Sequence, residues 1–198
     1  NEKLMCHSEP QGMPALRESI SAYLAKYKQI KTSPDNIVIS SGMEYLYQII
    51  IRLIDKNAVF GLEAVGYDII PALLEMNSLA YVDVPIDENG ILQLDFLDKN
   101  LSEKTKIVSV NQVSNALGVI NPIQEIISKV RKNTNAYIII DGAQSAPHFK
   151  IDVQAMDCDF FVFSGHKMYA PMGTGILYGK EEALRAIQPF HGGGEMIA

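Results

Sequence analysis

Short runs in which every residue is apolar constrain the fold of this chain most strongly. Residues 137–140 (YIII) and 160–163 (FFVF) are the clearest of these runs. A strand that is apolar on both sides is buried on both sides, which is typical of a central strand in a covered, mostly parallel sheet. Other apolar runs alternate along the chain with segments of helical periodicity. This alternation predicts an α/β fold.

The expected elements form a three-layer α/β/α domain with a mostly parallel, seven-stranded sheet. In the segment 13–28, for example, apolar residues recur with the period of a helix and form one apolar face: Leu16, Ile20, Tyr23, Leu24 and Tyr27. Strands are expected near residues 37–40, 58–61, 81–84, 107–111, 137–141, 160–164 and 175–178. Helices are expected near residues 13–28, 43–54, 67–76, 94–99, 123–132 and 181–187.

Composition narrows the class of protein. The 198 residues fit one domain, residues 1–198, and the net charge of −6 without a Lys/Arg run argues against binding nucleic acid or an anionic membrane. No apolar stretch reaches the roughly 18 residues that a membrane-spanning helix needs. Cys6 and Cys158 cannot form a disulfide framework, which favours a reducing, cytoplasmic location.

Ligands of such sheets bind beyond the carboxyl ends of the strands, so the residues that follow each strand are the candidate site. After the first expected strand, Ser41, Gly42 and Met43 open a helix, whose free N–H groups suit an anion. The same residues also fit a simple helix cap. Tyr67 follows the second strand and could stack on a planar ligand or cover the core.

Three later strand ends carry further candidates. Asn115 could bind the edge of a ligand or belong to an Asn-rich turn. Asp141 ends a very apolar strand, where a carboxylate needs a buried partner unless it caps a helix. Lys167 follows the sixth strand, where lost solvation favours a nucleophilic amine, although the side chain could also extend to solvent.

Together these strand ends supply an anion cradle, an aromatic plate, a carboxylate and an amine. These are the parts that hold pyridoxal 5′-phosphate (PLP), with the carboxylate on the ring nitrogen and the amine in a Schiff base. The four histidines show no metal-ligand spacing, so no metal site is expected. Cys158 stands between Asp157 and Asp159, whose charges should raise the pKa of its thiol.

From about residue 89 to residue 197 the chain resembles the SUF-type cysteine desulfurases of aminotransferase class V. The matching motifs are residues 113–118 (VSNALG), 141–144 (DGAQ), 157–160 (DCDF), 163–167 (FSGHK) and 192–197 (GGGEMI). The resemblance implies that Lys167 forms the Schiff base and that Asp141 faces the pyridine nitrogen. It also places Asn115 and Gln144 near the phenolic oxygen, and Ser164 and His166 at the phosphate.

Residues 1–88 resemble a different branch, the class I/II aminotransferases and in particular the aminotransferase-like domains of MocR-type regulators. The motifs are residues 11–17 (QGMPALR) and 37–46 (IVISSGMEYL). This resemblance places Ser41, Gly42 and Met43 in the phosphate loop and makes Tyr67 the ring-stacking aromatic. The change of class suggests a chimera of two halves, 1–88 and 89–198, with a junction within residues 84–94.

Both resemblances imply the large domain of a fold type I PLP enzyme. The small domain that carries the substrate-binding arginine and the sulfur-accepting cysteine is expected to be absent from this chain. The first expectation is a cysteine desulfurase, which converts L-cysteine to L-alanine plus enzyme-bound sulfur, or its truncated core. The alternatives are an aminotransferase, or a non-catalytic PLP-binding or engineered chimeric fold. A homodimer acting on an amino acid is expected.

Overall fold

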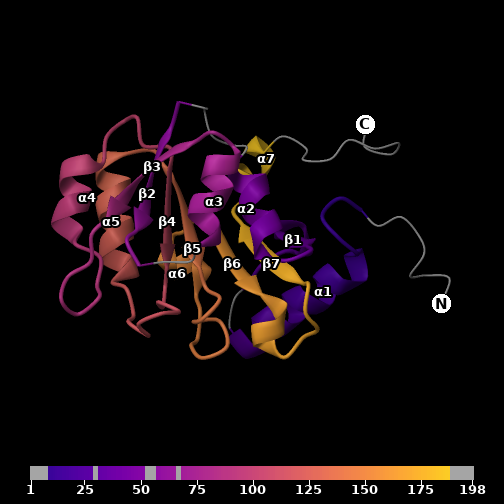
Figure 1. Cartoon of the computed structure of the whole chain (residues 1–198). Coiled ribbons are helices and arrows are strands. Elements are labelled where there is room, and N and C mark those ends of the chain that lie inside the picture. Colours follow the sequence, from indigo (N-terminus) through magenta and orange to yellow (C-terminus); the bar gives the residue numbers. More distant parts are fainter. Residues whose placement is uncertain (1–8, 29–30, 52–56, 66–67, 188–198) are drawn as a thin grey trace.

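The computed structural model describes residues 9–28, 31–51, 57–65 and 68–187 (Figure 1). Its main sheet has five strands in the spatial order β1-β7-β6-β5-β4. These strands are β1 (Ile37–Ser40), β7 (Gly175–Gly179), β6 (Phe160–Ser164), β5 (Tyr137–Asp141) and β4 (Ile107–Asn111). The pairs β4–β5 and β5–β6 are parallel, whereas β7 runs antiparallel to both β6 and β1.

The predicted seven-stranded, mostly parallel sheet is therefore wrong. The strands β2 (Val59–Glu63) and β3 (Ala80–Val84) form a separate parallel pair that lies next to β4. Residues 165–174 alone join β6 to β7, and a connection this short reverses the chain, because a parallel crossover needs a dozen or more residues. The described residues thus form a mixed five-stranded sheet and a two-stranded one.

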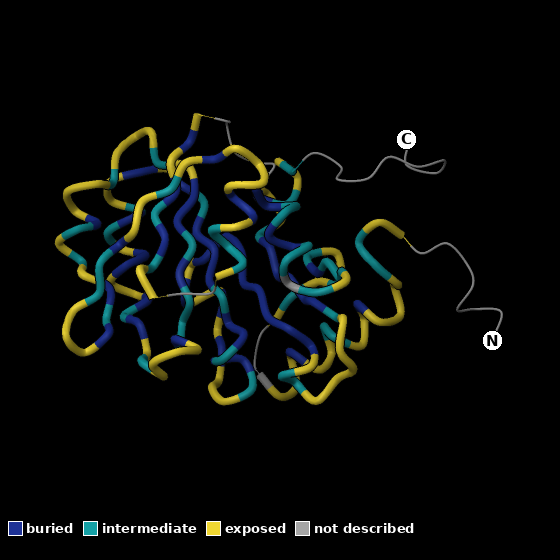
Figure 2. Tube along the Cα trace, viewed as in Figure 1, coloured by how far each residue is buried: buried dark blue, intermediate teal, exposed yellow. Residues whose placement is uncertain are grey.

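Helices cover both faces of the main sheet, so the three-layer expectation is confirmed. One apolar cluster lies beneath α4 (Leu94–Asn100), α5 (Ile123–Asn133) and the short α6 (Val153–Met156). The other lies beneath α2 (Met43–Ile51), α3 (Ile69–Met76) and α7 (Glu181–Ala186). Alternate residues of each central strand enter opposite clusters, as Ile139 and Ile140 of β5 do. The buried strands therefore lie at the centre of the molecule, where Figure 2 shows them in dark blue.

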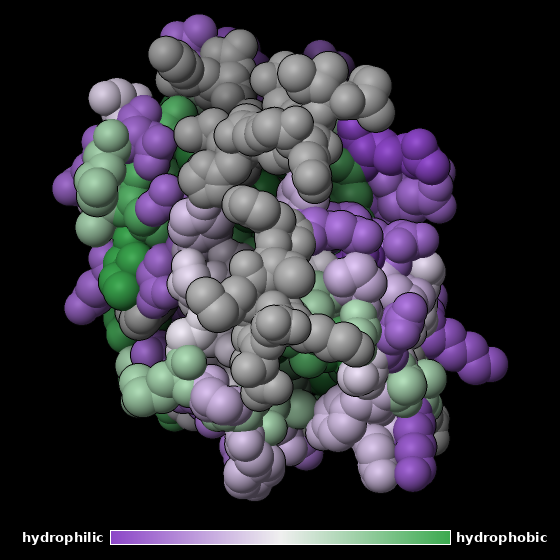
Figure 3. Space-filling model, turned by 90° about the vertical axis from the view of Figure 1, so that its right-hand side faces the viewer, coloured by the Kyte–Doolittle hydropathy of each residue, from purple (hydrophilic) through white to green (hydrophobic). Residues whose placement is uncertain are grey.

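The segment 13–28 is helical, as α1 (Pro14–Tyr23) and the π-helical turn η2 (Leu24–Lys28), but its apolar face is only partly buried. Leu24 lies in the core, whereas Leu16 and Tyr27 are exposed. The buried residue of α1 is Arg17, which pairs with Glu9 and donates to backbone carbonyls. Apolar side chains accordingly stand among polar ones on the side of the molecule where α1 lies (Figure 3).

In the part of the chain that the structure describes, no helix is both long and apolar enough to cross a lipid bilayer.

Candidate active site

The carboxyl ends of β1, β4, β5 and β6 line up at one edge of the main sheet, where antiparallel β7 begins. Asn111 of β4 is in register with Asp141 of β5, and Ser40 and Ser164 both face Gly175 of β7. A cavity of about 630 Å³ opens at this edge. Its wall contains most of the residues that the sequence indicated: Ser41, Gly42, Asn115, Asp141, Gln144, Ser164, His166 and Lys167. Tyr67 lies outside the described residues, and Met43 begins α2 but its side chain is not described.

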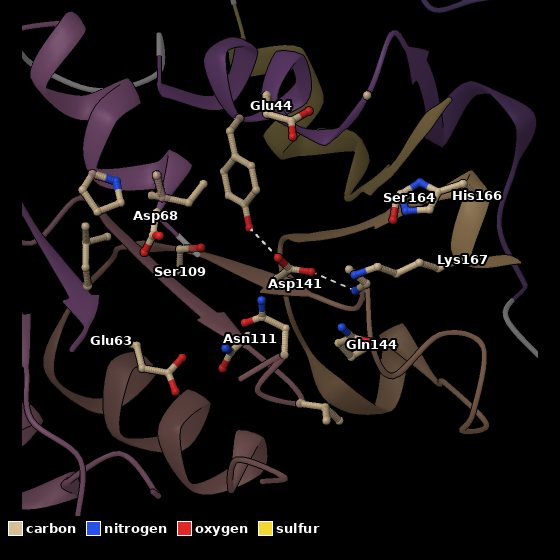
Figure 4. A pocket seen from close by; sticks show the side chains of 18 of the residues that line it. Glu44, Glu63, Asp68, Ser109, Asn111, Asp141, Gln144, Ser164, His166 and Lys167 are labelled. Carbon is tan, nitrogen blue, oxygen red and sulfur yellow. Dashed lines mark hydrogen bonds between the residues drawn. The ribbon is translucent and has the colours of Figure 1, made fainter. Parts of the chain in front are cut away.

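The carboxylate of Asp141 is held through both of its oxygens. The backbone N–H of Ala143 donates to Oδ1 at 2.8 Å, and the phenol of Tyr47 lies 3.3 Å from Oδ2 (Figure 4). Burial raises the pKa of Asp141, while the Ala143 N–H, the positive charge of Lys167 and the Tyr47 phenol lower it. Asp141 therefore caps a turn after β5, not the helix that the alternative interpretation assumed, and it also lines the cavity.

The turn after β5 requires glycine at position 142. A Cβ atom there would lie 2.0 Å from Cζ of Phe161 on the neighbouring strand. Only the missing side chain lets the backbone pass this ring and leave the sheet immediately after Asp141. The sequence Asp141–Gly142 thus combines the candidate carboxylate with the turn that places it in the cavity wall.

Lys167 lies in a 3₁₀ turn, η4 (Gly165–Met168), directly after β6. Its side chain is partly buried, lines the cavity and points toward Asp141 (Figure 4). Lys167 and Asp141, which the sequence placed at one edge of the sheet, therefore line the same cavity. The alternative, a lysine directed out to solvent, does not describe this side chain.

The β6 end of the cavity offers hydrogen-bond donors that a phosphate group could accept. The side chain of Ser164 is buried, and its Oγ has no hydrogen-bond partner among the described residues. A buried hydroxyl without a partner calls for a ligand or a water molecule. Exposed His166 stands beside it (Figure 4). Gly42, with a φ of +98°, leads into α2, whose first N–H groups add to the donors. These residues fit a phosphate-bearing cofactor.

Among the cavity residues that the sequence analysis missed are Tyr47, Glu63 and Ser109. Glu63 ends β2 just as Asp141 ends β5, so the strand-end rule could have found it. Burial raises the pKa of Glu63, and the side-chain amides of Asn111 and Asn121 lower it. Tyr47 lies within an apolar helix and Ser109 inside a strand, and neither position carries a signal in the sequence.

Cys158, the cysteine that the structure describes, does not line the cavity. Cys158 is fully buried, and burial, followed by the charge of Asp159, raises the pKa of its thiol to about 12. The predicted direction is confirmed, although burial rather than the flanking aspartates is the main cause. Within the described ranges, no group of three or more His, Cys, Asp or Glu side chains is arranged to hold a metal ion.

Comparison with known families and proteins gives a consistent result. The family model described as "Aminotransferase class-V" matches residues 70–198. A cysteine desulfurase of Enterobacter sp. (strain 638) is 51% identical over 115 residues, which cover 58% of this chain and 28% of that protein. One from Synechococcus elongatus is 55% identical over 115 residues, covering 18% of its length. The chain thus spans less than a third of these relatives.

Solved structures match nearly the whole chain. The cysteine desulfurase CsdA of Escherichia coli superposes with a TM-score of 0.78 and 27% identity, covering 93% of this chain and 48% of that one. Aspartate aminotransferase of Thermus thermophilus, at 14% identity and a TM-score of 0.76, shares the fold over 91% of this chain and 50% of its own. The family match begins at residue 70 and continues through residues 84–94, so it does not support the chimera hypothesis.

Proposed function

Because the chain belongs to the aminotransferase class-V family, whose members are PLP-dependent, we propose that it is the cofactor-binding domain of a cysteine desulfurase. The reaction transfers the sulfur of L-cysteine to an acceptor thiol, which becomes a persulfide, and leaves L-alanine. Since the chain spans 28% of the Enterobacter relative, the complete activity, its substrate and a homodimeric, cytoplasmic enzyme are all part of this proposal. Residues 1–198 would be its large domain.

Each of the predicted site residues would hold a different part of the cofactor. Asp141 would accept a hydrogen bond from the protonated ring nitrogen, and Lys167 would hold the aldehyde carbon. Ser164, His166 and the backbone at Ser41, Gly42 and Met43 would bind the phosphate, Asn115 and Gln144 the phenolic oxygen, and Tyr67 the ring face. When bound, PLP supplies an electron sink for negative charge that develops on the amino acid.

The single observation that carries the proposal is the convergence of Asp141 and Lys167 in one cavity. They come from different strand ends, 26 positions apart in the sequence, and the charge of Lys167 favours the ionised form of Asp141. Cys158 is not suited to accept sulfur, because a buried thiol with a pKa of about 12 provides almost no thiolate at neutral pH. The acceptor must be another thiol.

The test begins with cofactor binding. Adding PLP to the protein should produce a visible absorption band, and borohydride reduction followed by peptide mass spectrometry should place the cofactor on Lys167. Lys167→Ala should lose both signals, whereas Lys150→Ala, which changes an exposed lysine away from the cavity, should keep them. A colourless wild-type protein at saturating PLP would overturn the proposal.

A second measurement separates the desulfurase from other PLP chemistry. Sulfide and alanine released from L-cysteine in the presence of a reducing thiol report desulfurase activity, and keto-acid formation reports transamination. Equal amounts of sulfide and alanine are expected. Keto acid without sulfide would identify an aminotransferase, and a PLP band without any product would identify a non-catalytic PLP-binding protein.

A further inference from the structure

Asp141 has a polar contact with the helical layer of the fold, and this contact is the phenol of Tyr47. Tyr47 lies on α2, four residues after the helix begins, and its ring is buried in the apolar cluster beneath that helix. Tyr47 also lines the cavity, and its hydroxyl lies 3.3 Å from Oδ2 of Asp141 (Figure 4). We propose that Tyr47 is a positioning residue that holds the Asp141 carboxylate ready to accept a hydrogen bond from the cofactor ring. This inference rests on the proposed function.

The direction of this hydrogen bond follows from the neighbours of the phenol. Burial and the negative charge of Asp141 raise the pKa of Tyr47 well above its ordinary value, so its hydroxyl keeps its proton. Ser109, on β4, acts in the opposite direction and lowers the pKa of Tyr47. An ionised carboxylate can only accept, so the phenol donates to Asp141.

Two donors on different oxygens fix the carboxylate plane. The terminal torsion of an aspartate side chain is broad, so a single hydrogen bond leaves the plane free to turn. Here Oδ1 is held by the Ala143 N–H at 2.8 Å and Oδ2 by Tyr47. The donors belong to different layers, since Ala143 follows β5 in the sheet and Tyr47 lies on a covering helix. The free lone pairs of the carboxylate are consequently directed into the cavity.

A competing explanation is that Tyr47 only fills space between α2 and the sheet. Phenylalanine would fill that space equally well, because the ring is the part that packs in the apolar cluster. Tyr47→Phe therefore removes the hydroxyl while keeping the packing. Tyr45→Phe is the matched control, since it makes the same change on the same helix at a side chain outside the cavity wall.

The first readout needs no cofactor. Carbon-13 NMR titration of the Asp141 carboxyl, assigned with Asp141→Asn, should show a higher pKa in Tyr47→Phe than in the wild type. Ser109→Ala should shift it in the same direction by less, and Tyr45→Phe should leave it unchanged. An unchanged titration of Asp141 in Tyr47→Phe, with the fold intact by circular dichroism, would overturn the inference.

The second readout is the affinity for PLP, measured from the visible band. Tyr47→Phe should weaken binding about fivefold, which corresponds to about 1 kcal/mol at 25 °C and is typical of one hydrogen bond. If the wild type binds PLP and Tyr47→Phe changes neither readout, the inference fails and the proposed function stands. If the wild type binds no PLP but the Asp141 titration still shifts, the proposed function fails and the role of Tyr47 in holding the carboxylate stands.

Discussion

Burial raises the pKa of Asp141 even though a backbone N–H, Lys167 and the Tyr47 phenol all favour its charged form. A carboxyl whose pKa is higher in the folded than in the unfolded state binds more protons when folded. The free energy of unfolding therefore falls as the pH rises through the interval between the two pKa values. At neutral pH, ionised Asp141 makes the protein without cofactor less stable than a neutral side chain of the same shape would.

We therefore expect Asp141→Asn to stabilise the protein without cofactor at pH 7. The amide oxygen can accept from the Ala143 N–H, and the amide nitrogen can donate to the Tyr47 oxygen, so both contacts have replacements. The gain should be about 1 kcal/mol, as is common when a functional charge is removed. Chemical denaturation at decreasing pH should show this gain shrinking as folded Asp141 takes up its proton, down to the ordinary aspartate pKa of 3.8. Asp83→Asn, at an exposed carboxylate, is the control, and a loss of stability in Asp141→Asn would contradict this account.

At the residue scale, sequence reasoning succeeded where a chemical group stands at the end of a strand. Asp141 and Lys167 stand at or just after apolar strands, so the strand-end rule placed both at the edge where the cavity opens, whereas Ser164 was indicated by the family resemblance. Tyr47 could not be found in this way, because a tyrosine within an apolar helix usually belongs to the core. Its ring does belong to the core, and only the geometry of α2 against β5 shows where the hydroxyl lies.

At the element scale, charged residues join the edge of the sheet opposite the cavity. Asp159, which precedes β6, accepts from Arg131 of α5 at 2.9 Å and from the Ile138 N–H of β5 at 2.7 Å. Asp157 pairs with Arg131 and with Lys180, which follows β7. These contacts connect α5 with β5, β6 and β7 at the edge of the sheet that lies opposite the cavity. Since these contacts do not involve the edge of the sheet where the cavity opens, we interpret them as contacts that stabilise the fold.

This network predicts an acid-sensitive contribution to stability. The hydrogen bond from Lys180 is the main cause that lowers the pKa of Asp157 below the ordinary aspartate value of 3.8. Ionised Asp157 therefore stabilises the fold fully above that pH, and this stabilisation is lost as the pH falls from 3.8 through the lowered value. Asp157 is 57% exposed, so solvent screening limits the contribution to less than about 1 kcal/mol.

Lys180→Met should lower the melting temperature slightly at pH 7 and flatten its decline below pH 3.8. The change removes the positive charge but keeps an apolar stem that can pack. Lys132→Met, at an exposed lysine near the end of α5, should leave the profile unchanged. Melting curves recorded by circular dichroism from pH 7 to strongly acidic solution provide the measurement. An equally steep acid decline in Lys180→Met would show that this ion pair does not contribute.

Strand pairing shows why sequence patterns predict elements better than sheets. Each expected strand is present in the structure, but β2 and β3 pair with each other instead of extending the main sheet. Apolar runs report burial, and Val59 and Val82 of this pair are in fact exposed. β7 is antiparallel because the link from β6 is too short for a parallel crossover. Periodicity carries no information on either point.

At the scale of the whole molecule, α1 and η2 leave an exposed apolar surface. It consists of Met13, Leu16, Tyr23 and Tyr27, which are 40%, 43%, 43% and 61% exposed. The rings of Tyr23 and Tyr27 also contact each other, with centroids 5.1 Å apart, so they present one continuous aromatic surface. Clustered apolar side chains of this kind are more costly in water than the same residues scattered singly. Covering them by association with another molecule would recover hydrophobic free energy.

We therefore expect the chain to self-associate in a concentration-dependent way. Light scattering coupled to size-exclusion chromatography should give masses above the 21.9 kDa of one chain as the concentration rises. Leu16→Glu combined with Tyr27→Glu should weaken the association at least tenfold, because each change places a charge within the surface that must be dehydrated. Ser19→Glu adds a charge at another exposed position of α1 and should have little effect. A wild-type chain that stays monomeric at every concentration would show that this surface does not drive association.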